Sequence, residues 1–210
     1  MKHPRNDFLI ERLAFFSDAV FAIAITLMVI EIHPPLVNRG DTDEMVWDKF
    51  RETLPEFLGL LVSFWLIASS WLRHHQLFKY LDKYDMSFVL LNLWLLFTII
   101  LFPFSTSFLF NSLFAGGVSK LQVYFYLGVP LGSNFLTYCM YQLANKRQLI
   151  GEADVAFRNS VLSQGMMVLS FLLAIVWVIL MPLQYHMIGY AFLGCGPIVG
   201  ALLNKKRHST

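Results

Sequence analysis

The sequence predicts an all-α integral membrane protein in which one domain, residues 1–210, holds six transmembrane helices. Hydrophobic residues make up 57% of the chain and charged residues only 14%, whereas soluble domains carry about 25% charged residues. The apolar segments reach the ~20 residues that cross ~30 Å of hydrocarbon. Short polar or proline-containing stretches separate them. We expect spans at about 8–32, 54–78, 86–110, 119–144, 158–181 and 184–203.

Each boundary has a chemical reason. HPP at 33–35 ends the first helix, because proline disfavours helical geometry in the residue before it. The charged segment 79–85 separates the second and third spans, a glycine pair lies in 111–117, and 145–154 is polar. Pro182 divides the fifth span from the sixth. Prolines inside spans predict kinks, which neighbouring helices tolerate in lipid, at Pro103, Pro130 and Pro197.

The basic residues predict the orientation. Of the 16 lysines and arginines, the expected outer segments hold only Arg39, Lys49, Arg51 and Lys120. The excess on the other side predicts that both termini are cytoplasmic in a multi-pass plasma or inner membrane protein. The outer loop at 33–53 is acidic; it either concentrates cations or is an ordinary solvated loop. The net charge of +2 gives no reason to expect nucleic acid as a partner.

The first span carries polar residues that are costly in lipid. Arg12, Ser17 and Asp18 lie near its start and Thr26 lies deep inside. A carboxylate at mid-membrane costs ~2.5–3.5 kcal/mol on insertion scales. We therefore expect Asp18 to hold a polar network together or to line an ion path. The alternative is that Asp18, near the inner end of the span, simply reaches interfacial water.

The second and third spans offer partners for these groups. The adjacent His74 and His75 point about 100° apart on a helix, whereas a metal-binding pair takes i,i+4 spacing. We expect one of them to hydrogen-bond Asp18 or Ser17. Asn92 also needs a partner inside its span. No Walker A loop, GxSxG elbow or Cys/His zinc pattern occurs, so we expect neither an enzyme nor a bound metal or cofactor.

Three motifs together resemble a known family. RLAFFSD at 12–18 matches an RxxxFSD signature, WLRHHQLF at 71–78 fits WxxHHxxF, and the third span combines NLWLL with PFST. This pattern resembles the transmembrane protein 175 family of potassium channels, known from lysosomes and from prokaryotes. The prokaryotic members are single six-helix units that assemble as tetramers, and a single 210-residue unit looks like that type.

The resemblance implies a potassium-permeable cation channel, a homotetramer whose first helices line a central pore with a hydrophobic constriction. The partners it implies are further copies of the chain, the lipid bilayer and monovalent cations, with permeating potassium as the only bound ion. It places Ile23 at the narrowest ring and Met28 and Val29 toward lipid. The implied lining residues are Ile23, Thr26, Leu27 and Ile30. The implied structural network is Arg12, Phe16, Ser17, Asp18, His74, His75, Asn92 and Trp94.

The residues leave other functions open. A secondary transporter or proton pathway would use Asp18 and a span-two histidine as a relay. Alternating-access transporters usually contain paired broken helices in two halves, and the sequence has no such symmetry. An intramembrane enzyme built on the same groups is the weakest hypothesis, because no nucleophile or metal set accompanies them.

Overall fold

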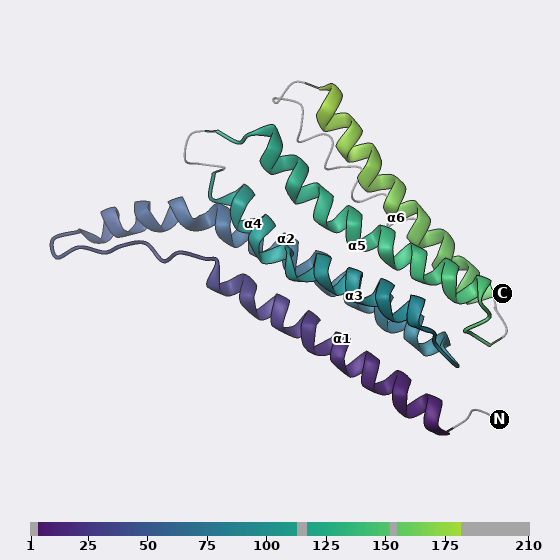
Figure 1. Ribbon diagram of the computed structural model, residues 1–210. Coiled ribbons are helices and arrows are strands. Elements are labelled where there is room, and N and C mark those ends of the chain that lie inside the picture. Colours follow the sequence, from purple (N-terminus) through teal and green to yellow (C-terminus); the bar gives the residue numbers. More distant parts are fainter. Residues whose placement is uncertain (1–3, 113–116, 152–154, 182–210) are drawn as a thin grey trace, which may run out of the picture.

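The structure is a computed structural model that describes residues 4–112, 117–151 and 155–181. These residues form helices that run alongside one another (Figure 1). In chain order they are α1 (Pro4–Ile30), α2 (Asp43–Tyr80), α3 (Met86–Ile100), α4 (Phe102–Phe110), α5 (Lys120–Lys146) and α6 (Val155–Leu180). α1 packs on α2 and α3, and α5 packs on α3, α4 and α6.

Four stretches of the described chain are long and apolar enough to cross a membrane: Phe8–Ile30, Asp43–Tyr80, Met86–Phe110 and Val155–Leu180. They correspond to the first, second, third and fifth expected spans, so the chain is a multi-pass membrane protein. α5 occupies the expected fourth span but is not among the four candidates. The sixth expected span, 184–203, lies outside the described residues, so the count of six helices is not confirmed.

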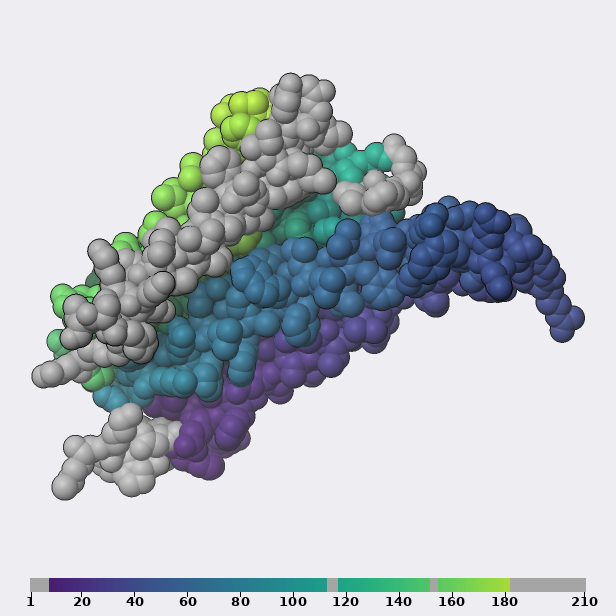
Figure 2. Space-filling view, turned by 180° about the vertical axis from the view of Figure 1, so that it is seen from behind, coloured from purple at the N-terminus to yellow at the C-terminus, as the bar shows by residue number. Residues whose placement is uncertain are grey.

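The segment expected as an outer loop is partly helical. α2 begins at residue 43 and not at 54, so the prediction of a loop over 33–53 is wrong for residues 43–53. Thr42 caps the helix by accepting a hydrogen bond from the Met45 amide. Acidic residues occupy the first turn, where their negative charges stabilise the helix by interacting with the positive end of its dipole. At ~1.5 Å per residue, the 38 residues of α2 exceed the ~30 Å of a bilayer core. The start of α2 projects beyond the bundle in Figure 2.

At Pro103, where we expected a kink, the third span is divided into two helices. α3 ends at Ile100 and α4 begins at Phe102, with Pro103 in the first turn of α4. Proline lacks an N–H and clashes with the carbonyl four residues earlier, so the third span is made of two helices. α5 continues through Pro130 without a break, and Pro197 lies outside the described residues.

The core lies between α2, α3 and α5 and continues to α1 through its packing on α2 and α3. Phe21, Leu77, Leu95 and Leu127 are among its fully buried side chains. Many other apolar side chains on the outer faces of the helices are exposed, as expected for a chain that faces lipid or other subunits. The packed interior therefore fixes one face of α1 and leaves its other face uncovered.

Candidate functional site

α1 has a buried face with a regular helical period. Ile10, Ser17, Phe21, Ala24 and Met28 are each at most 8% exposed, and their spacings of three, four and seven residues place them on one side of the helix. This face packs on α2 and α3. The expectation that Met28 faces lipid is therefore wrong, because Met28 lies four residues after Ala24 on the buried stripe.

The opposite face of α1 carries the residues predicted to line a pore. Ile23, Leu27 and Ile30 are 56%, 41% and 71% exposed in the single chain, and Thr26 is also exposed. The Thr26 hydroxyl donates to the Ile23 carbonyl at 2.9 Å, which leaves its oxygen lone pairs on the exposed side. Ala19 and Ala22 on the same face would allow another helix to approach closely.

A chain of hydrogen bonds anchors the buried face of α1 to two other helices. The Asn92 amide nitrogen on α3 donates to the Ser17 hydroxyl at 2.9 Å, and Ser17 donates to the Leu13 carbonyl at 2.9 Å. The Asn92 amide oxygen lies 2.8 Å from His74 Nε2 on α2. Because that oxygen can only accept, Nε2 carries the proton. Ser17, His74 and Asn92 are each at most 1% exposed.

Asp18 has a different partner from those expected. The Trp71 indole N–H on α2 donates to Asp18 Oδ1 at 2.7 Å. Neither histidine nor Arg12 makes a hydrogen bond or ion pair with Asp18 among the contacts of the described residues. His75 stacks on Trp71, with ring centroids 5.4 Å apart and planes inclined by 23°. Trp71 was missed as a site residue, although its place in the WxxHHxxF motif was a signal.

Three residues assigned to the network lie away from it. Arg12 and Phe16 are four residues apart on the exposed face of α1, and the Arg12 guanidinium lies 5.9 Å from the centre of the Phe8 ring. Trp94 is 61% exposed and packs edge-on against Phe97. Trp94 follows Asn92 by two residues, a rotation of about 200° on a helix, so the two side chains cannot share a face.

A second polar cluster, not anticipated from the sequence, ties α2 to α4 and α5. The Thr106 hydroxyl donates to Ser63 Oγ at 2.7 Å, and Ser63 Oγ lies 3.1 Å from the Tyr126 hydroxyl. All three residues are buried. Thr106 belongs to the PFST motif of the third span. Hydroxyl pairs of this kind hold helices together in lipid.

The segment that connects α1 to α2 makes polar contacts with α2. The His33 amide donates to Glu56 Oε2 at 2.7 Å. Asp41 accepts from Lys49 Nζ at 2.6 Å and from the Asn38 amide at 2.7 Å. These two donors hold the pKa of Asp41 below its ordinary value of 3.8. Within the described residues, no three His, Cys, Asp or Glu side chains come together in a way that could hold a metal ion.

Comparison with known proteins finds relatives of residues 12–103, the part of the chain that contains the hydrogen bonds between α1, α2 and α3. The family model for "Endosomal/lysosomal potassium channel TMEM175" matches residues 12–103. A potassium channel of Streptomyces collinus is 36% identical over 98 residues, 47% of this chain and 46% of that protein. A potassium channel of a Chryseobacterium species is 38% identical over 104 residues, 50% of each chain. The resemblance to the TMEM175 family is confirmed.

The TMEM175 match contains Ser17, Asp18, Trp71, His74 and Asn92, and the chain spans about half the length of the curated bacterial relatives it matches. A zebrafish protein named "Endosomal/lysosomal proton channel TMEM175" is 34% identical over 86 residues, which is 39% of this chain and 16% of that protein.

Solved structures extend the fold comparison to nearly the whole chain. The structure of a lysosomal potassium-selective channel TMEM175 homolog from Chamaesiphon minutus superposes with a TM-score of 0.68 at 24% identity, covering 94% of this chain and 97% of that one. A variant of the potassium channel MtTMEM175, solved in complex with a nanobody fusion protein, superposes with a TM-score of 0.63 at 20% identity, covering 95% and 94%. The chain thus has the fold of these TMEM175 structures.

Proposed function

We propose that this protein is a potassium-permeable cation channel, a homotetramer whose central pore is lined by the exposed face of α1. In this proposal the membrane is the plasma or inner membrane, and both termini are cytoplasmic. The observation that carries the proposal is the division of α1 into a hydrogen-bonded buried face and an apolar uncovered face. One helix cannot enclose a pore, so four copies would supply the four faces.

The apolar face would act as the gate. Four isoleucine side chains at Ile23 would form a ring that blocks ions by size or by expelling water. Leu27 and Ile30 would extend the apolar section, and the exposed Thr26 oxygen would offer a polar contact to a partly dehydrated cation. Potassium would be preferred over sodium because the larger ion loses its hydration shell at a lower cost. Such a pore would select less sharply than a cage of carbonyl groups.

Replacing Ile23 by Asn tests the proposal. The amide should keep water in the ring, so the potassium flux into liposomes should rise and the preference over sodium should fall. Val29→Ala is the matched control, because Val29 is similarly exposed, at 59%, but lies outside the predicted lining. If Ile23→Asn leaves flux and selectivity unchanged while Val29→Ala alters them, the pore assignment fails. Native mass spectrometry of the same sample should give four chains, and a conducting monomer would contradict the assembly.

A proton pathway is the second candidate. The zebrafish relative is named a proton channel, and Asp18 is a carboxylate within the first span. The indole of Trp71 cannot relay protons, since it only donates, so Asp18 would have to exchange protons with water. Asp18→Asn should then abolish proton flux driven by a pH gradient. Unchanged proton flux in the variant would exclude this pathway.

A further inference from the structure

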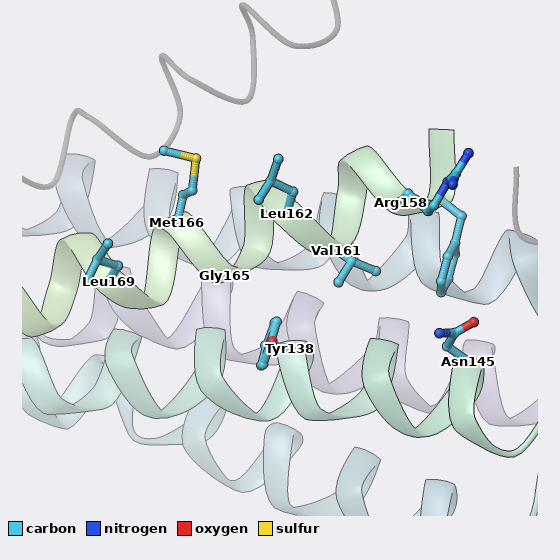
Figure 3. A pocket seen from close by; sticks show the side chains of 9 residues that line it. Tyr138, Asn145, Arg158, Val161, Leu162, Gly165, Met166 and Leu169 are labelled. Atoms are coloured by element: carbon cyan, nitrogen blue, oxygen red, sulfur yellow. The ribbon is translucent and has the colours of Figure 1, made fainter. Parts of the chain in front are cut away.

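A groove of about 390 Å³ lies between α5 and α6, far along the chain from the α1 anchor (Figure 3). α6 supplies one wall with residues at spacings of three and four, and this wall runs for ~16 Å along the helix axis. The lining residues are Tyr138, Asn145, Phe157, Arg158, Val161, Leu162, Gly165, Met166 and Leu169.

The body of the groove is apolar and remains open at a glycine. A Cβ atom added to Gly165 would lie 3.5 Å from Tyr138 Cε2, an ordinary van der Waals contact. Alanine therefore fits at this position, whereas a longer side chain would fill the groove. Val161, Leu162 and Leu169 line the same groove. Its length and chemistry suit a hydrocarbon chain.

One end of the groove is cationic. Figure 3 shows Arg158 and Asn145 at the same end of the groove, with the Arg158 side chain pointing away from Asn145, and Leu169 and Met166 toward the other end. Arg158 is exposed and belongs to none of the ion pairs among the described residues. Arg147 nearby in sequence differs, because its guanidinium is paired with Asp85 at 2.6 Å. Within the described part of the chain, no carboxylate neutralises Arg158, which lies beside the apolar groove.

We propose that this groove binds a phospholipid with an anionic headgroup from the cytoplasmic leaflet. The headgroup phosphate would accept hydrogen bonds from Arg158, and one acyl chain would follow the α6 wall past Gly165. Arg158 lies close to the connection between α5 and α6, on the side where the excess of basic residues predicts the cytoplasm. Basic pockets between helices on that side suit anionic headgroups. The lipid site does not depend on whether α1 lines a pore.

The direct test uses the unsubstituted protein in nanodiscs with phosphatidylglycerol that carries a photoreactive group in its acyl chain. Peptide mass spectrometry should locate the adducts in residues 161–169. Unlabelled phosphatidylglycerol should compete, and phosphatidylcholine should compete poorly. Adducts elsewhere, or a groove that cross-links to a second copy of the chain, would overturn the proposal. Equal competition by both lipids would overturn the claim of an anionic headgroup.

Substitutions test the Arg158 charge and the apolar groove separately. Arg158→Gln should weaken the preference for phosphatidylglycerol about fivefold, which corresponds to the ~1 kcal/mol that one basic residue contributes near an anionic surface. Lys146→Gln is the matched control, because Lys146 is an exposed cation near the same helix ends but does not line the groove. Gly165→Leu should abolish the adducts, whereas Gly165→Ala should keep them. If Lys146→Gln weakens binding as much as Arg158→Gln, binding is a general surface effect and the site is refuted.

Discussion

Replacing Asn92 by Ala should break the hydrogen-bonded link between three helices. The Asn92 side chain is fully buried and bonds His74 on α2 at 2.8 Å and Ser17 on α1 at 2.9 Å. An interhelical hydrogen bond in a membrane protein contributes ~0.6 kcal/mol on average and up to ~1.7 kcal/mol. Losing two of them should lower the free energy of unfolding by about 1–3 kcal/mol. Ser17 would keep its hydrogen bond to the Leu13 carbonyl, whereas His74 would lose its hydrogen-bond partner on α3.

The assay is equilibrium unfolding in mixed micelles, followed by tryptophan fluorescence. Asn111→Ala is the matched control, because the Asn111 amide bonds Ser107 at 3.0 Å in an exposed position, where the loss should be below about 0.5 kcal/mol. A double-mutant cycle of Asn92→Ala with Ser17→Ala should give a coupling energy above about 0.5 kcal/mol. If Asn92→Ala costs no more than Asn111→Ala, or the coupling vanishes, the anchor does not hold α1 in place.

Two further outcomes follow from contacts outside this chain of bonds. Trp71→Phe keeps an aromatic ring but removes the indole donor, so Asp18 loses its 2.7 Å hydrogen bond. The same unfolding assay should show that the free energy of unfolding falls by about 1–2 kcal/mol. An unchanged free energy of unfolding would show that this hydrogen bond does not stabilise the protein. The carboxylate of Asp41 stabilises its turn only while ionised, and its pKa is held below 3.8. The contribution is therefore lost as the pH falls through that depressed pKa, and amide exchange at Asn38 should then accelerate. Asp41→Asn should remove this pH dependence, and a dependence that persists in the variant would exclude Asp41 as its source.

The positions of the helices could be predicted from the sequence, but the start of α2 could not. Apolar length locates α1, α2, α6 and the pair α3–α4, since crossing ~30 Å of hydrocarbon requires long apolar segments, and α5 is located by the polar segments on either side of it. The break at Pro103 follows from the missing N–H of proline. The charge of residues 43–53 predicts a loop, yet Thr42 caps a helix there. Hydropathy detects the part of a helix in lipid and misses its extension into water.

The members of the polar anchor were partly predictable, and their pairing was not. Ser17, His74 and Asn92 stand out because each polar side chain in an apolar span needs a partner. Which groups meet depends on how each helix is rotated about its axis, and the packing of buried side chains such as Phe21 decides that rotation. Trp71 reaches Asp18 because an indole offers one donor on a large apolar body, so it can bond a carboxylate without adding charge.

Two hydroxyl groups on α1 show how the anchor and the proposed pore can coexist on one helix. Ser17 and Thr26 are nine residues apart, which is two and a half turns, so they lie on opposite sides. The Ser17 hydroxyl is held between Asn92 and the Leu13 carbonyl in the core, whereas the Thr26 oxygen is bonded only within its own helix and remains exposed. Rotating α1 to bury Thr26 would expose Ser17 and break its bond to Asn92. The cost of that loss fixes which face α1 presents, and the apolar face around Ile23 needs no polar contact of its own to be held in position.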